Sequence, residues 1–151
     1  MRILVQRSLD SKVSVDKKTV GSIKSGLVLL VGFTKNDTEK EIDYMIKKVL
    51  NLRIFDDDEG VMNRSVLDVS GQILSISQFT LYADTKKGNR PSYINALESS
   101  KASKLYDLFN DKLSKFISVE TGIFGADMLV EIKNDGPITI LLEKENKNDK
   151  K

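Results

Sequence analysis

Alternating and continuous runs of apolar residues indicate that the first third of the chain consists mostly of β-strands. Apolar and polar positions alternate over residues 3–8 and again over 13–16, as in strands whose two faces differ. Residues 16–18 are typical of a turn, and a further strand is predicted at 19–23. Residues 27–31 are all apolar, so we predict a strand that is buried on both faces.

Two later segments have the spacing of amphipathic helices. The first runs from Thr38 to Leu50, and Thr38 and Glu41 have the separation of a capping box. Its predicted inner face consists of Ile42, Met45, Ile46, Val49 and Leu50. The second helix is predicted over residues 101–117, with an apolar stripe of Leu105, Leu108, Phe109, Leu113, Phe116 and Ile117.

The remaining apolar segments predict strands, and their order indicates the fold class. These segments are residues 53–55, 72–79, 119–121, 128–132 and 138–142. Because the strands follow one another and do not alternate with helices, we predict an α+β fold with mostly antiparallel sheets and two amphipathic helices. One domain is expected over residues 1–143, and the polar residues 144–151 are expected to form a disordered tail.

The composition excludes several kinds of chemistry. The 151 residues include no Cys and no His, so disulfides, thiolate nucleophiles and Ser-His-Asp catalysis are impossible within this chain. The acidic run at 56–60 does not fit a calcium loop, because Gly60 comes one position early and Leu67 stands where a bidentate Glu is needed. Catalysis must use carboxylates, Lys, hydroxyls, backbone amides or a group of the substrate. We expect no metal and no cofactor.

The charge distribution and the first residues bear on partners and location. The net charge of +2 lies in residues 144–151, because the preceding residues carry equal numbers of basic and acidic side chains. A general DNA-coating protein is usually more basic, so no DNA partner is expected. Residues 1–7 do not resemble a signal peptide, and no apolar run approaches the roughly 20 residues of a membrane span. We therefore expect a cytoplasmic protein without a membrane partner.

Residues 77–80, Ser-Gln-Phe-Thr, lie where a predicted strand ends. Strand ends and the turns after them often expose backbone N–H groups, which can form an oxyanion hole. Thr80 could act as a nucleophile only with a base beside it, and the motif contains neither His nor Lys. The alternative is a strand end whose hydroxyls satisfy local backbone groups.

Three cations occupy one predicted loop together with aromatic residues. They are Lys86, Lys87 and Arg90, with Tyr82 and Tyr93 nearby. This combination suits a phosphate backbone and a stacked base. An ordinary charged surface loop would have the same composition.

Two glycine-containing segments also have two interpretations. Residues 122–125 form a G-x-x-G in which Phe124 could stack on a base, although two glycines also permit a simple bend. Residues 134–137, Asn-Asp-Gly-Pro, are typical of a turn between two strands, and their Gly-Pro bond is a candidate cis peptide.

Taken together and in this order, six segments resemble the D-aminoacyl-tRNA deacylase family, in its D-tyrosyl type. They are residues 1–7, 51–55, 77–84, 87–92, 121–128 and 134–139. The resemblance extends from Met1 to about Leu142. It implies that family's fold and a cytoplasmic homodimer that hydrolyses the ester between a D-amino acid and tRNA. Glycyl-tRNA would also be a substrate, whereas L-aminoacyl-tRNA would be spared.

The resemblance also implies roles for individual residues. The catalytic pocket would be lined by Ser77, Gln78, Phe79 and Thr80. A cis Gly136–Pro137 bond would reach into the partner subunit's active site, where its backbone would exclude an L side chain, and Arg7 would hold this loop. The terminal adenosine would be received by Phe124, Gly125 and Met128. Because they follow the pocket strand, we expect RNA phosphates to meet Lys86, Lys87 and Arg90.

Two mechanisms are compatible with these residues. An activated ester can be hydrolysed without a side-chain base if the protein supplies position and an oxyanion hole. The vicinal hydroxyl of the terminal ribose would then orient or activate the water, and we favour this mechanism because nothing in the sequence gives Thr80 a base. The rival mechanism makes Thr80 a covalent nucleophile.

Two other functional classes stay open. One is a non-catalytic nucleic-acid-binding module on the same scaffold, which would need the basic loop but not the intact Ser-Gln-Phe-Thr and Gly-Pro motifs. The other is a structural or interaction protein, for which the sequence gives no positive sign.

Overall fold

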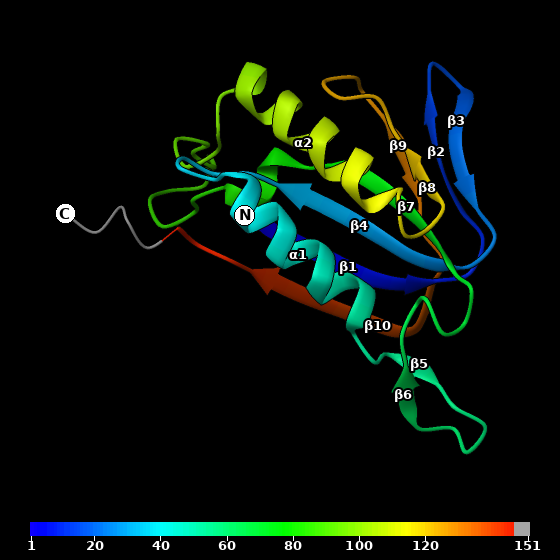
Figure 1. Ribbon diagram of the computed structural model, residues 1–151. Helices are drawn as coiled ribbons and strands as arrows, with labels where there is room; N and C mark the ends of the chain where they lie inside the picture. Colours follow the sequence, from blue (N-terminus) through cyan, green and yellow to red (C-terminus); the bar gives the residue numbers. More distant parts are fainter. Residues whose placement is uncertain (147–151) are drawn as a thin grey trace.

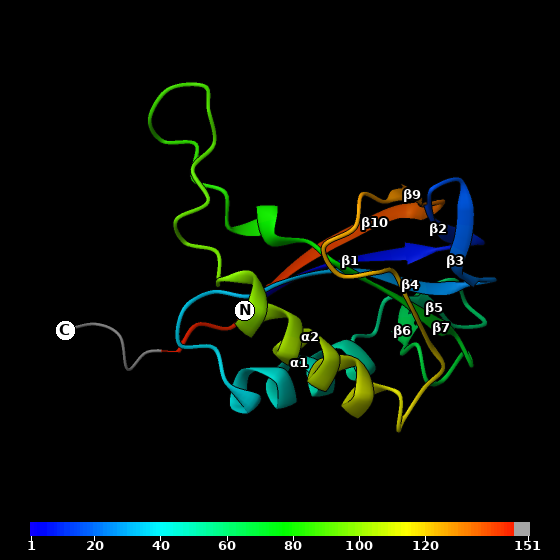
Figure 2. The ribbon, with the colours of Figure 1, turned by 90° about the horizontal axis from the view of Figure 1, so that it is seen from above.

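A five-stranded sheet forms the centre of the protein, with two helices on one face and a three-stranded sheet on the other (Figures 1 and 2). The computed structural model describes residues 1–146. The elements are β1 (Arg2–Ser8), β2 (Ser11–Val15), β3 (Lys18–Ile23), β4 (Gly26–Gly32), α1 (Glu39–Asn51), β5 (Phe55–Asp56), β6 (Met62–Arg64), β7 (Gln72–Ser77), the 3₁₀-helix η1 (Phe79–Tyr82), α2 (Ser99–Leu113), β8 (Val119–Thr121), β9 (Leu129–Glu131) and β10 (Asn134–Glu143). The large sheet has the order β10-β1-β4-β7-β8, the small sheet has the order β3-β2-β9, and β5 pairs with β6.

The large sheet is mixed, whereas the sequence predicted strands that do not alternate with helices. β1 pairs antiparallel with β4 and β10, but β4, β7 and β8 run parallel. α1 connects β4 to β7, and α2 connects β7 to β8, because parallel neighbours need a crossover that returns the chain to the same end of the sheet. The prediction of an α+β protein with two helices and mostly antiparallel pairing is confirmed. The prediction that the helices do not separate the strands was wrong for these three strands.

β4 and α1 have the burial that their sequences predict. Leu27 and Leu29 of β4 pack with the helices, whereas Val28 packs against the small sheet, so both faces of the strand are buried. Thr38 and Glu41 form the predicted capping box at the start of α1. The five apolar residues predicted for its inner face are all buried. Within residues 1–146, neither helix is long and apolar enough to cross a membrane.

Three predicted boundaries differ from the structure. α2 ends at Leu113, and in the tight turns that follow, the N–H of Phe116 donates to the carbonyl of Leu113. These turns move Phe116 off the apolar face of the helix, so this predicted core residue is 61% exposed. β7 ends at Ser77, because the chain enters η1. Residues 134–137, predicted as a turn between strands, form the start of β10.

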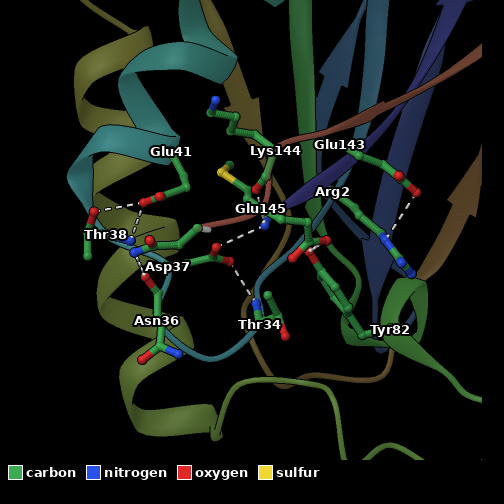
Figure 3. Close-up of polar contacts among 12 residues, drawn as sticks. Arg2, Thr34, Asn36, Asp37, Thr38, Glu41, Tyr82, Glu143, Lys144 and Glu145 are labelled. Atoms are coloured by element: carbon green, nitrogen blue, oxygen red, sulfur yellow. Dashed lines mark hydrogen bonds and ion pairs between the residues drawn. The ribbon is translucent and has the colours of Figure 1, made fainter. Parts of the chain in front are cut away.

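A buried ion pair holds the amino terminus against the loop before α1 (Figure 3). The Met1 ammonium lies 2.9 Å from Oδ1 of Asp37, and both groups are fully buried. The N–H of Thr34 donates to Oδ2 of Asp37 at 2.7 Å. Burial raises the pKa of Asp37, and the Thr34 N–H and the Met1 ammonium oppose that shift. The ion pair therefore fixes the path of the chain between β4 and α1.

Two residues of the predicted tail, Lys144 and Asn146, contact the domain. Met1 and Lys144 exchange two backbone hydrogen bonds of 2.9 Å, and the side chain of Asn146 donates to the carbonyl of Asn36 at 2.8 Å. The rest of that predicted tail, residues 147–151, lies outside the described residues.

We expect Asp37→Asn to lower the free energy of unfolding by about 3–5 kcal/mol, because it leaves the buried Met1 ammonium without a counter-charge. Asp43→Asn is the matched control. The Asp43 carboxylate is exposed and pairs with Lys112 at 2.7 Å, so its loss should cost less than about 1 kcal/mol. Urea unfolding at neutral pH measures both. Equal losses would contradict a special contribution of the Met1 pair.

Candidate active site

The Ser-Gln-Phe-Thr motif forms the transition from β7 to η1. The N–H of Leu81 donates to the carbonyl of Gln78 at 3.3 Å, which is the first hydrogen bond of the 3₁₀ turn. The N–H groups of Phe79 and Thr80 precede this bond, so the turn itself does not use them. The predicted strand end is confirmed in position to within two residues. Two adjacent backbone donors lie outside the hydrogen bonding of η1.

The Thr80 hydroxyl is bonded to an amide. Nε2 of Gln78 donates to Oγ1 of Thr80, and within residues 1–146 this is the one hydrogen bond that the Thr80 side chain makes. An amide N–H group is a donor and cannot accept the proton of a hydroxyl. The contacts of Thr80 therefore supply no general base.

A cavity of about 510 Å³ adjoins η1 and lies within the size range of small-ligand sites. It brings together five of the residues that the sequence predicted for the pocket, namely Ser77, Phe79, Phe124, Gly125 and Met128. Gln78 and Thr80 do not line it. The segments that contribute are separated in sequence. They meet here because β7 and β8 are parallel, so η1 and the loop after β8 both begin at the same end of the sheet.

Two aromatic contacts fix the rings of Phe79, Tyr93 and Phe124, which line this cavity. The rings of Phe79 and Tyr93 meet edge to face, with their centroids 5.0 Å apart. The ring of Phe124 lies 5.9 Å from that of Tyr106 in α2. The Tyr106 hydroxyl donates to the buried carbonyl of Ser75 at 2.7 Å, and burial raises its pKa. Phe124 therefore packs on a side chain that is itself fixed to the sheet.

The sequence did not predict the lining residues around the start of α2. Leu97 and Glu98 contribute to the cavity wall, as do Ala96 and Ala102. No sequence signal distinguishes them, because they are ordinary residues at the entry to an amphipathic helix. Tyr93, by contrast, stands beside the cations of the basic loop in the sequence, where that composition indicates a stacked base.

The Gly136–Pro137 bond is cis and lies in a bulge of β10. Gln6 is paired with Thr139 and Ser8 with Asn134, so the residues between these two partners bulge opposite Arg7. Gly136 has a φ of +127°, and a Cβ there would lie 2.8 Å from Cγ1 of Ile138. Only glycine fits this backbone.

Arg7 is almost buried and binds this bulge. Its Nε donates to the carbonyl of Asp135 at 3.2 Å and lies 3.3 Å from that residue's carboxylate. Its Nη1 donates to the carbonyl of Ile54 at 2.9 Å and lies 3.6 Å from Oδ1 of Asp56. One guanidinium thus connects the bulge to the segment that follows α1.

The two motifs lie at opposite ends of the large sheet. Along the β1–β4 pair, Arg2 is opposite Gly32 and Ser8 is opposite Gly26. Ser77 lies beside the Gly32 end, whereas the bulge lies beside Ser8. Six residues of strand separate these ends, or about 20 Å. Within one chain, Gly136–Pro137 therefore does not reach the cavity beside η1.

The basic loop projects from the protein next to the cavity, on the side of the sheet away from α1 and α2 (Figure 2). Its base is closed by two hydrogen bonds between Asp84 and Ser92, of 2.7 and 2.8 Å. Its cations are exposed and do not line the cavity; they are Lys86, Lys87 and Arg90. Tyr82, which the sequence suggested for base stacking, is buried under the guanidinium of Arg2, so that role was wrong.

Comparisons with known proteins agree with these features. A solved structure described as "c-Myc DNA Unwinding Element Binding Protein" is 39% identical, with a TM-score of 0.92 over 97% of this chain and 100% of that one. A second, described as a probable eukaryotic D-amino acid tRNA deacylase, is 17% identical and shares the fold, with a TM-score of 0.80 over 93% of this chain and 97% of that one. The family model for D-Tyr-tRNA(Tyr) deacylase matches residues 4–143. The resemblance found in the sequence is confirmed, and the chain belongs to the D-Tyr-tRNA(Tyr) deacylase family of hydrolases.

Proposed function

We propose that the cavity beside η1 receives the aminoacylated 3′ end of tRNA and that the chain hydrolyses its ester when the amino acid is D or glycine. The products are the free amino acid and tRNA, and L-aminoacyl-tRNA is spared. The observation that carries this proposal is the pair of backbone donors at Phe79 and Thr80, which lie outside the hydrogen bonding of η1, beside a cavity of about 510 Å³. We place this activity in the cytoplasm, where its substrate is used, and expect no cofactor.

The reaction needs no side-chain base. The N–H groups of Phe79 and Thr80 would hold the negative charge that develops on the ester carbonyl oxygen. Water attacks the carbonyl carbon, and the bond between that carbon and the ribose oxygen breaks. The proton lost by the water passes to the departing ribose oxygen, with the vicinal 2′-hydroxyl orienting the water. This division suits a chain that has neither His nor Cys.

The chirality filter would come from the partner subunit. The cis Gly136–Pro137 bulge is too far from the cavity of its own chain, so a second chain is needed to bring both motifs into one site. A filter made of main chain rejects one enantiomer by steric clash and does not read the side chain. Glycine has no side chain and would pass it. Arg7 would act as a positioning residue for this bulge through its contact with Asp135.

An apolar row that is exposed at its β10 end marks the face on which this partner would pack. Leu141, Leu4 and Leu30 lie opposite one another across β10, β1 and β4. Ile140 and Leu142 pack toward the helices, so Leu141 points to the other face, where it is 48% exposed. The small sheet covers the β4 and β7 side of this face. The β10 side stays open, beside the bulge.

A second function has one observation in its favour. The 39% identical structure is described as a protein that binds a DNA unwinding element. A nucleic-acid-binding module on this scaffold would use the exposed cations of the loop without hydrolysing anything. We expect no DNA partner, because the domain has no overall excess of positive charge.

One assay separates the two functions. Single-turnover hydrolysis is measured for D-Tyr-tRNA, Gly-tRNA and L-Tyr-tRNA, each with the terminal 2′-hydroxyl present or removed. We expect the first two to be hydrolysed and the third to be spared, and most of the rate to disappear without the 2′-hydroxyl. Tight binding of all three without hydrolysis would favour the second function.

Thr80→Ala distinguishes the two mechanisms. If the substrate's ribose assists, the variant loses one hydrogen bond of about 0.5–1.5 kcal/mol, which is roughly tenfold in rate at most. If Thr80 is the nucleophile, the loss is several orders of magnitude. Single-turnover hydrolysis of D-Tyr-tRNA measures the rate, and a thermal melt checks the fold. A folded variant that is slower by about a thousandfold or more would decide for the covalent mechanism.

Leu141→Lys tests the need for two subunits. A charge at the exposed end of the apolar row should produce monomers, and these should lose D-selective hydrolysis because no partner supplies Gly136–Pro137. Val20→Lys is the control, since Val20 is also exposed, at 40%, but lies on β3. Ultracentrifugation gives the assembly state. A folded Leu141→Lys monomer with full selectivity would exclude a site shared between subunits.

A further inference from the structure

A second groove continues from the cavity along the start of α2. It has a volume of about 880 Å³ and lies between the loop before α1 and the first turns of α2. Leu97 and Glu98 line both the groove and the cavity, so these two residues form the ridge between them. A ligand that extends beyond the cavity on the helix side must cross this ridge into the groove.

Three exposed lysines surround the groove, and they are Lys35, Lys101 and Lys104. None of them forms an ion pair with another residue of the described range 1–146. The groove also contains Asp37, whose carboxylate is buried and neutralised by the Met1 ammonium (Figure 3). The remaining acid is Glu98, which accepts a hydrogen bond from Ser100 at 2.6 Å. Positive charge therefore predominates.

The backbone that carries these lysines is firmly fixed. Lys101 and Lys104 are about one turn apart, so their side chains leave α2 on the same side. Lys35 lies in the turn that the Thr34–Asp37 hydrogen bond closes at 2.7 Å. The N–H of Leu97 donates to the carbonyl of Phe33 at 3.0 Å, which joins the two walls of the groove. The fold thus fixes the backbone positions from which the three side chains extend.

We propose that this groove binds the sugar-phosphate strand of the RNA just before its terminal nucleoside. The proposal rests on the function proposed above, because it extends the ligand that occupies the cavity. Phosphates would meet the three lysines, and Leu97 and Leu105 would contact the sugars between them. Continuity with the cavity favours a nucleic-acid strand over an acidic peptide, which would have no reason to end there.

This groove and the basic loop lie on different sides of the cavity. The loop extends on the side of the large sheet away from the helices, whereas Lys101 and Lys104 lie on α2 (Figure 2). The groove approaches the cavity on rigid backbone across a two-residue ridge. We therefore assign the strand next to the terminal nucleoside to the groove, and any contact with the loop to a more distant part of the RNA.

A pair of triple variants tests the groove. The test variant is Lys35→Gln/Lys101→Gln/Lys104→Gln. The control, Lys24→Gln/Lys47→Gln/Lys115→Gln, makes the same change in net charge. Lys47 and Lys115 line a different groove, at the carboxyl ends of the two helices, and Lys24 follows β3. All six lysines are exposed, and none of them forms an ion pair within residues 1–146. Both proteins should therefore fold, which a thermal melt checks.

The first measurement is binding of uncharged tRNA over a range of salt concentrations. The test variant should make the slope of log affinity against log salt shallower by about 2–3, whereas the control should change it by less than about 1. The second measurement compares KM for D-Tyr-tRNA with KM for a D-tyrosyl ester of adenosine, which ends inside the cavity. The test variant should raise KM for the tRNA at least about tenfold more than KM for the short ester.

Glu98→Gln should have the opposite effect and tighten tRNA binding, because it removes the one exposed acid from the ridge. Equal slopes for the test and control variants would overturn the proposal, as would a rise in KM of the same size for both esters. Failure of the proposed function would look different, since the unmodified protein would then hydrolyse neither ester. The binding measurement would still report on the groove.

Discussion

The packing of β4 is the constraint on which the rest of the structure depends. Both of its faces are buried, so the helices and the small sheet must pack on it from opposite sides. Glycines at its ends let β7 come close: a Cβ on Gly26 would lie 2.0 Å from the carbonyl oxygen of Gln72, and one on Gly32 would lie 2.9 Å from that of Gln78. The second approach matters for function, because Gln78 begins the turn that carries Phe79 and Thr80. Strand pairing thus sets the position of the candidate oxyanion donors.

The proposed site therefore depends on main chain at both of its ends. Backbone N–H groups would stabilise the reacting carbonyl, and the backbone of Gly136–Pro137 would exclude the wrong enantiomer. Side chains act mainly by holding these segments, as Arg7 does for the bulge and Tyr106 does for the wall beside Phe124. An enzyme of this kind can dispense with His and Cys, provided that its substrate already carries an activated ester and a neighbouring hydroxyl.

Local patterns predicted the elements whose structure is decided locally. The capping box and apolar face of α1 and the continuous apolar run of β4 were correct, because short-range spacing determines both. The parallel pairing of β4, β7 and β8 was missed, since periodicity does not report which strands become neighbours. Phe116 continues the helical spacing but follows the actual helix end. The resemblance named five of the residues that line the cavity, but neither Leu97 nor Glu98, whose importance comes only from where α2 begins.

Both edges of the large sheet resist pairing with a strand from another molecule. β8 has three residues and offers little backbone to extend. At the other edge, the bulge in β10 interrupts the regular ladder, and Pro137 has no N–H group to donate. Polymerisation by edge-to-edge hydrogen bonding, the usual start of fibril formation, is thereby disfavoured. The same few residues that would sort enantiomers thus also shorten the regular edge that another strand could join.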